Sequence, residues 1–145
     1  MHNEMKITIC GSMTFAKQMK EVKVKLEQLG HVVTLPCDVE THVEDAALID
    51  DLEADAKHLR ENDVLRRCFR LVEESEAVLV LNYDKNGVRG YVGTSSLMEM
   101  GLAYHLNKEL FLWQEVPHSK HYRWAHEVGV MEPAVLNQDL TKIPL

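Results

Sequence analysis

The amino-acid sequence predicts one α/β domain over residues 1–145, built on a doubly wound parallel sheet of about five strands. Short β-rich runs alternate with segments whose apolar residues recur at helical spacing. One run, Ala77-Val78-Leu79-Val80-Leu81, is apolar at every position, as in a parallel strand that is covered on both faces. A hydrophobic content of 46% is enough to build such a core without disulfides or a structural metal.

The first 36 residues predict a strand, a helix and a second strand. The strand covers Lys6–Cys10 and is broken by Gly11-Ser12. The apolar residues of the helix follow a spacing of four and three that places them on one face: Phe15, Met19, Val22, Leu26 and Leu29. Gly30 stops this helix, and Pro36 ends the β-rich run His31–Leu35. This order predicts a right-handed βαβ unit.

The segment 38–61 changes in character, because nine acidic residues stand there against Lys57 and Arg60 as the only basic ones. Its apolar residues also have helical spacing: Leu48, Leu52, Ala56 and Leu59. Two interpretations remain open, a partly helical insertion that covers a site and a plain surface helix.

Asn62 or Asp63 is suited to cap the next helix, which ends near Ser75. The apolar stripe of that helix is predicted to be buried: Val64, Leu65, Cys68, Leu71 and Val72.

After the Ala77–Leu81 strand comes a polar loop that is rich in glycine, Asn82–Gly93. A helix from about Thr94 to Asn107 and a strand at Glu109–Trp113 follow, and Pro133–Leu136 is a candidate edge strand. The complete order of elements predicts helices on both faces of the sheet.

Composition excludes several classes of partner. A formal charge of −7, without a basic stripe, disfavours polymeric nucleic acid. No apolar stretch has the length of a membrane span and the first residues do not resemble a signal peptide, so a cytoplasmic protein is expected. The three cysteines, Cys10, Cys37 and Cys68, are widely spaced and odd in number, which predicts reduced thiols, two of them at core-like positions.

Ligands of open parallel sheets bind where loops leave the carboxyl ends of the strands, here Gly11–Thr14 and Asn82–Ser96. In the first loop, Gly11 and Ser12 precede a helix whose free N–H groups favour an anion. An ordinary helix cap at Ser12 or Thr14 explains the same residues equally well. The second loop leads to Glu99, a carboxylate one turn into a helix among apolar neighbours.

The segment around Glu99 resembles a known family. Its pattern of Gly93-Thr94, Glu99-x-Gly101-x-Ala103-Tyr104 and Asn107-Lys108 is similar to the signature of the nucleoside 2-deoxyribosyltransferases. The turn Cys10-Gly11-Ser12 resembles that of the related 2′-deoxynucleoside 5′-monophosphate N-glycosidases, where it helps to hold the phosphate.

This resemblance implies a flavodoxin-like (Rossmann-like) fold, a homo-oligomer and cleavage of the N-glycosidic bond of a small deoxynucleoside or its monophosphate, without cofactor or metal. Glu99 occupies the position of the family's nucleophile. The chemistry is plausible in itself, since a carboxylate can trap the oxocarbenium-like centre at C1′. Transfer to a second base and hydrolysis both remain open. The substrate is expected to contact residues of both loops: Gly11, Ser12, Asn82, Gly93, Thr94, Ser95 and Ser96.

Several residues have competing interpretations. Ser96-Leu97-Met98-Glu99 also fits a capping box, which would make Glu99 structural. Tyr91 stands where the family often has an Asp, so Asp84 is the candidate second catalytic residue, although Asp84-Lys85-Asn86-Gly87 is equally a turn sequence. The arginine that often follows the phosphate-binding turn is missing, and Lys17 is the candidate substitute.

The C-terminal region contains an aromatic and histidine-rich segment: His118, His121, Tyr122, Trp124 and His126. Its spacing does not match a metal motif, so an interface between copies of the chain is expected instead. Two other functions compete with the N-glycosidic enzyme. One is a nucleotide-binding module without turnover, and the other is cleavage of a ribonucleotide such as NAD.

Overall fold

The computed structural model describes residues 4–36, 39, 50–118 and 120–144, and it confirms the predicted α/β class. The strands form one five-stranded sheet in the order β2-β1-β3-β4-β5, and all four pairings are parallel. They are β1 (Lys6–Cys10), β2 (Val32–Thr34), β3 (Ala77–Val80), β4 (Glu109–Leu112) and β5 (Ala134–Val135). This arrangement is consistent with a flavodoxin-like doubly wound fold. The order in which strands are added to the sheet reverses between β1 and β3, since β2 lies on one side of β1 and β3 on the other.

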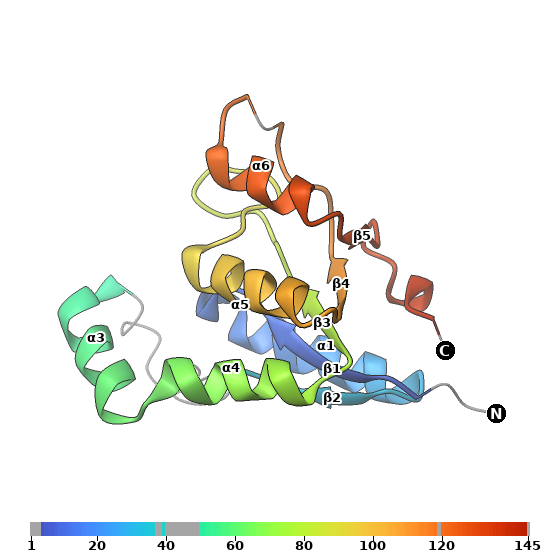
Figure 1. Cartoon of the computed structure of the whole chain (residues 1–145), viewed down its shortest axis with the longest axis horizontal. Helices are drawn as coiled ribbons and strands as arrows, with labels where there is room; N and C mark the ends of the chain where they lie inside the picture. Colours follow the sequence, from blue (N-terminus) through green and yellow to red (C-terminus); the bar gives the residue numbers. More distant parts are fainter. Residues whose placement is uncertain (1–3, 37–38, 40–49, 119, 145) are drawn as a thin grey trace.

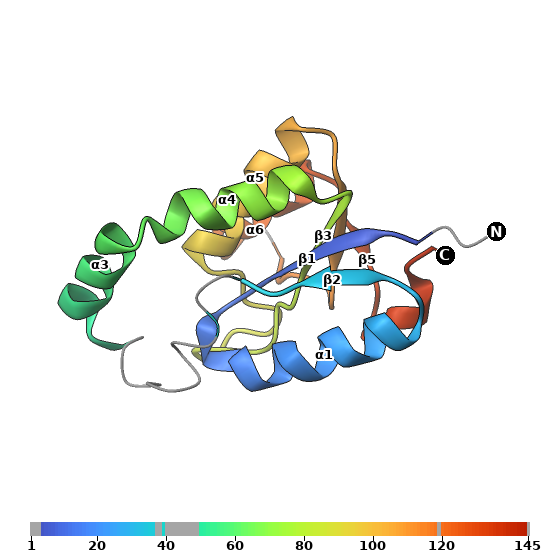
Figure 2. The same cartoon turned by 90° about the horizontal axis from the view of Figure 1, so that it is seen from below.

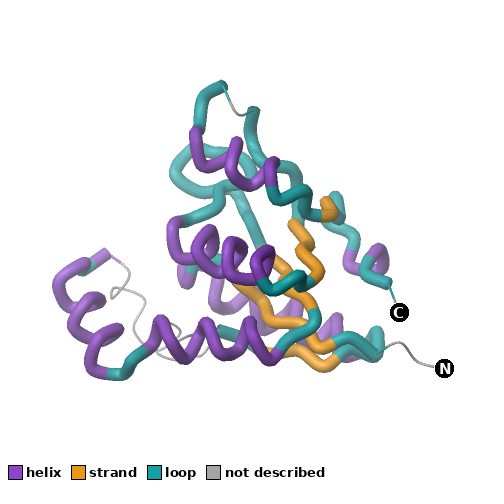
Figure 3. The backbone as a smooth tube through the Cα atoms, in the orientation of Figure 1, coloured by secondary structure: helices purple, strands orange, loops and turns teal. Residues whose placement is uncertain are grey.

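Helices cover both faces of the sheet (Figures 1 and 2). Figure 2 shows α1 on one side of the strands and α4 with α5 on the other. The helical elements are η1 (Met13–Phe15), α1 (Ala16–Gln28), α3 (Leu52–Glu61), α4 (Val64–Glu74), α5 (Thr94–His105), α6 (Arg123–Val130) and η3 (Leu140–Lys142). The segment between β3 and α5 is a long loop (Figure 3), as its polar, glycine-rich sequence predicted.

The strands divide the core into two layers, because successive side chains of a strand point to opposite faces. In β3, Ala77 and Leu79 belong to the layer under α1, whereas Val78 and Val80 belong to the layer under α4 and α5. All four side chains are buried. The continuous apolar run therefore has the cause that was expected, a strand covered on both faces.

Several element boundaries differ from the prediction by one or two residues. Strand β2 covers only Val32–Thr34, because pairing with β1 ends at Thr34. Helix α1 is preceded by the separate 3-10 turn η1, and Gly30 takes a φ of +100° just after the helix, as a C-terminal stop does. Helix α5 ends at His105, and Asn107 lies outside it in the left-handed region with a φ of +58°.

The predicted N-cap of α4 is confirmed in its position but not in its hydrogen bond. Asp63 does hold the N-cap position, but it has a left-handed φ of +49° and its side chain caps no backbone N–H. Its Oδ1 instead accepts a hydrogen bond from Arg66 at 3.2 Å. The predicted stripe is buried only in part: Val64 and Val72 are buried, Cys68 and Leu71 are partly buried, and Leu65 is 44% exposed.

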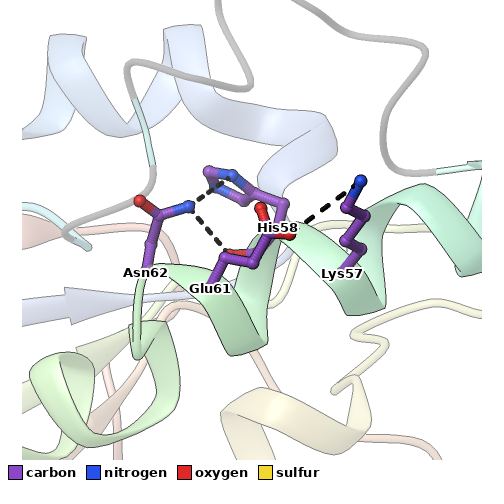
Figure 4. A network of polar contacts seen from close by, with 4 residues as sticks. All are labelled: Lys57, His58, Glu61 and Asn62. Atoms are coloured by element: carbon purple, nitrogen blue, oxygen red, sulfur yellow. Dashed lines mark hydrogen bonds and ion pairs between the residues drawn. The ribbon is translucent and has the colours of Figure 1, made fainter.

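Of the acidic segment 38–61, the structure describes residue 39 and residues 50–61, which include α3. The other residues of the segment, Leu48 among them, lie outside the described residues. Asp51 caps α3 by accepting a hydrogen bond from the N–H of Ala54 at 3.1 Å. At the other end, Asn62 donates to the carbonyl oxygen of His58 at 2.9 Å (Figure 4). Figure 1 shows α3 projecting beyond the sheet, and it contributes no buried residue to the core.

Within the described residues, no helix has both the length and the apolar character that crossing a membrane requires.

The buried side chain of His31 should make the stability of the protein depend on pH. The side chain is buried, and neither ring nitrogen has a hydrogen-bond partner in the described structure. Burial lowers the pKa of His31 below its ordinary value of 6.5, since it disfavours the charged imidazolium. Below pH 6.5 the unfolded chain therefore takes up a proton that the folded chain resists, and stability falls as the pH falls.

The variant His31→Leu removes this proton uptake. Its free energy of unfolding relative to that of the wild type should therefore rise as the pH is lowered from 7.5 to 5. Urea unfolding at several pH values measures the difference. The same change at exposed His126 is the control and should give no such trend. A difference between wild type and His31→Leu that is constant with pH would contradict the prediction.

Candidate active site

A cavity of about 300 Å³ lies at the carboxyl ends of β1 and β3, where a flavodoxin-like sheet places its ligand. Most of the predicted site residues lie on its walls. The lining comprises Gly11, Ser12, Met13, Pro36, Asp55, Leu59, Val64, Leu65, Cys68, Lys85, Tyr91, Gly93, Thr94, Ser95, Ser96 and Glu99.

Glu99 reaches the cavity from the second turn of α5. The helix begins at Thr94, directly after Gly93, so its first turn also lines the cavity. The carboxylate is partly buried, and its Oε2 accepts a hydrogen bond from the thiol of Cys10 at 2.7 Å. Cys10 is the last residue of β1, so the sheet and α5 together position this carboxylate.

The surroundings of Glu99 act on its ionisation in opposite directions. Burial raises the pKa of Glu99 above its ordinary value, and the hydrogen bond from Cys10 lowers it by a smaller amount. Burial, with Glu99 beside it, raises the pKa of the Cys10 thiol well above its usual range. Cys10 therefore stays protonated at neutral pH and can donate to the carboxylate.

The capping-box interpretation of Glu99 is wrong. The N-cap residue of α5 is Gly93, which has no side chain, and Ser96 is the third residue inside the helix. The Glu99 carboxylate accepts its hydrogen bond from the thiol of Cys10 and not from a backbone N–H at the helix start. The carboxylate therefore has no capping role.

The turn after β1 serves both as a helix cap and as a wall of the cavity. Ser12 Oγ accepts a hydrogen bond from the N–H of Thr14 at 3.3 Å, which makes Ser12 the cap of η1. A Cβ on Gly11 would lie 2.9 Å from Met19 Cε and 3.2 Å from the carbonyl oxygen of Leu81, so this position leaves little room for a side chain.

The cation of the site is Lys85, which the sequence analysis did not select. Its Nζ donates a hydrogen bond to Ser12 Oγ at 2.7 Å and lies 6.0 Å from the centre of the Tyr91 ring. Lys17, the candidate from the sequence, is exposed and does not line the cavity. Lys85 belongs to the loop after β3, whereas Lys17 lies in α1.

A tight hairpin fixes the position of Lys85. The N–H groups of Lys85 and Val88 each donate to the carbonyl oxygen of the other, at 3.0 and 2.9 Å. Between them, Asn86 and Gly87 have φ values of +54° and +71°, as in a type I′ turn. The sequence Asp84-Lys85-Asn86-Gly87 predicted a turn at this place, but the contact between Lys85 and Ser12 depends on the fold.

Asn82 and Asp84 lie apart from the cavity, in a polar network that holds the loop. Asn82 is buried; its side-chain amide donates to the carbonyl oxygens of Gly90 and Gln114 and accepts from the N–H of Gln114. Asp84 Oδ1 accepts from the N–H of Gly90 at 3.0 Å and from Gln114 Nε2 at 2.8 Å. These bonds favour the turn interpretation of Asp84 over a catalytic one, and a structural role for Asn82.

Helices α3 and α4 form the opposite wall of the cavity. Asp55 and Leu59 come from α3, and Cys68 comes from α4, where it is partly buried. The described part of the acidic segment therefore does border the site. Of the other two cysteines, Cys10 is buried and Cys37 lies outside the described residues.

The aromatic C-terminal segment packs beside the site loop. Trp124 lies edge-on to Tyr91, with ring centres 5.8 Å apart, and 5.6 Å from Tyr122. The three histidines of the segment are exposed. Over the described ranges, no group of three or more His, Cys, Asp or Glu side chains is placed to hold a metal ion.

Comparison of the sequence with models of known protein families finds no match, and comparison with curated proteins finds none either.

Proposed function

We propose that this protein cleaves the N-glycosidic bond of a deoxynucleoside or deoxynucleoside 5′-monophosphate, with Glu99 as the nucleophile. The observation that carries the proposal is the partly buried Glu99 carboxylate in the wall of a 300 Å³ cavity at the β1/β3 crevice. A cavity of this volume suits a small molecule. A carboxylate whose pKa is perturbed by burial in such a cavity is typical of functional sites.

In the proposed reaction a Glu99 carboxylate oxygen attacks C1′ of the sugar, and the C1′–N bond breaks as the new C1′–O bond forms. The bonding electron pair leaves with the base nitrogen, which takes up a proton from water. A second base or a water molecule then attacks C1′, releases the Glu99 carboxylate and loses a proton to solvent. The first acceptor gives transfer and the second gives hydrolysis.

A second group of residues on the cavity wall supports recognition of a 5′-phosphate. Lys85 supplies a positive charge, and Ser12 a hydroxyl, at the turn after β1. The first turn of α5, at Thr94, Ser95 and Ser96, supplies backbone N–H groups that lack helical partners. A phosphate there would accept charge-assisted hydrogen bonds while C1′ lies nearer Glu99.

Replacing Lys85 by methionine tests this part of the proposal. We expect Lys85→Met to weaken binding of a 5′-monophosphate by about tenfold or more and to leave binding of the nucleoside unchanged, since only the phosphate uses the charge. Calorimetric titration of both ligands measures the effect. Lys17→Met is the control, because Lys17 is exposed. An equal loss for both ligands, or none for the monophosphate, would contradict the assignment.

The function itself is tested by incubating the protein with deoxynucleosides, their 5′-monophosphates, ribonucleotides and NAD, and following the free base. Release from the deoxy compounds is expected, and added acceptor base distinguishes transfer from hydrolysis. Release only from ribonucleotides or NAD would move the activity to those substrates. Binding without any release would instead favour a nucleotide sensor.

The proposal includes a cytoplasmic homo-oligomer, with the segment around Tyr122 and Trp124 at the contact between copies. Both side chains are half-buried, with Trp124 packed against Tyr91 and Tyr122 against Trp124, and the neighbouring His118, His121 and His126 are exposed. The mass of the protein in solution tests the assembly, and a strict monomer would count against it.

A further inference from the structure

The thiol of Cys10 contacts the proposed nucleophile from the side of the sheet. Cys10 is fully buried at the end of β1, and its Sγ donates to Glu99 Oε2 at 2.7 Å, whereas Glu99 itself lines the cavity. We propose that Cys10 is a positioning residue that holds Oε2, so that the carboxylate presents Oε1 to C1′ of the substrate. This inference rests on the proposed function and concerns the same site.

The position of Cys10 makes it a rigid reference point for Glu99. Cys10 pairs with Val80 in the centre of the sheet, and both side chains pack in the layer under α5 with Met100 and Ala103. A glutamate side chain has three rotatable torsions, so a nucleophile without a fixed partner would spend part of its time misaligned. A hydrogen bond from a side chain locked in the core restricts those torsions.

A thiol is suited to this place because it packs like a small apolar group and still donates a hydrogen bond. Burial keeps Cys10 protonated by raising its pKa, and its hydrogen bond lowers the pKa of Glu99. Other titratable groups line the same cavity from three elements: Asp55 of α3, Cys68 of α4, and Lys85 and Tyr91 of the loop before α5. Cys10→Ala removes the hydrogen bond that lowers the pKa of Glu99 and leaves these other groups in place, so it should move the titration of Glu99 to higher pH.

The kinetic test compares Cys10→Ala and Cys10→Ser with Val80→Ala. The last variant is a matched control, since Val80 lies opposite Cys10 in the same buried layer and is not a site residue. We expect Cys10→Ala to lower kcat about tenfold with KM within about twofold, the loss of one hydrogen bond to a charged group. The acid limb of its pH profile should also move to higher pH. Cys10→Ser, which keeps a donor, should restore both, and Val80→Ala should change neither.

A second measurement does not depend on activity. NMR of protein labelled at the glutamate side-chain carboxyl carbon follows the titration of Glu99, whose signal is identified by its absence in Glu99→Gln. We expect a higher midpoint in Cys10→Ala than in the wild type and Val80→Ala. An unchanged midpoint, or kinetics equal to those of Val80→Ala, would overturn the proposal. A shifted midpoint in a protein that releases no base would support the hold of Cys10 on Glu99 and reject the proposed function.

Discussion

Replacing Glu99 by glutamine is expected to slow release of the base by at least about a hundredfold while leaving the fold intact. Glutamine has the same size and keeps an oxygen that can accept the hydrogen bond from Cys10, so little packing changes. It lacks the negative charge that attack on C1′ requires. The rate of base release at saturating substrate and the melting temperature measure the two parts of this prediction.

The same substitution at Glu109 is the control, because Glu109 is exposed at the start of β4. Glu109→Gln should match the wild type in both measurements. The absence of a capping role for Glu99 sharpens the comparison, since no loss of a helix cap is expected in Glu99→Gln. A folded Glu99→Gln protein that turns over normally would reject Glu99 as the nucleophile and favour the binding module.

Substituting Gly90 by alanine is expected to reduce the free energy of unfolding by about 2 kcal/mol or more. Gly90 has a φ of +69°, and a Cβ there would lie 2.1 Å from the carbonyl oxygen of Glu115. That atom belongs to the backbone, so the loop itself must move. The backbone of Gly90 is hydrogen-bonded to the side chains of Asn82 and Asp84, so the movement should also disturb the hairpin that positions Lys85. Urea unfolding measures the loss of stability.

Gly129→Ala is the matched control for this substitution. Gly129 lies inside α6, where a Cβ would have no neighbour within 4 Å beyond the adjoining backbone of its own helix, so alanine there should raise stability by up to about 1 kcal/mol. Equal unfolding midpoints for Gly90→Ala and the wild type would show that the loop adapts, and would contradict the required close approach of Gly90 to Glu115.

The alternation of strands and helices could be predicted because it depends on spacing within short segments. The buried run Ala77–Leu81 gave β3, and the helical spacing from Phe15 to Leu29 gave α1. Boundaries were less predictable, since they depend on neighbouring elements. β2 is shorter than its β-rich run because its pairing with β1 ends at Thr34. The N-cap of α4 was predicted at the right residue, but the side chain of Asp63 accepts its hydrogen bond from the Arg66 side chain and not from a backbone N–H.

The sequence by itself determined that Glu99 lies early in a helix after a polar loop, and that Gly11 and Ser12 form the turn after the first strand. Both features depend on neighbours along the chain. Only the tertiary structure decided that Cys10 meets Glu99 and that Lys85 meets Ser12, pairs that are 89 and 73 residues apart. The physical reason is that parallel strands are joined by long crossovers, so the strand order decides which residues meet at the carboxyl edge of the sheet.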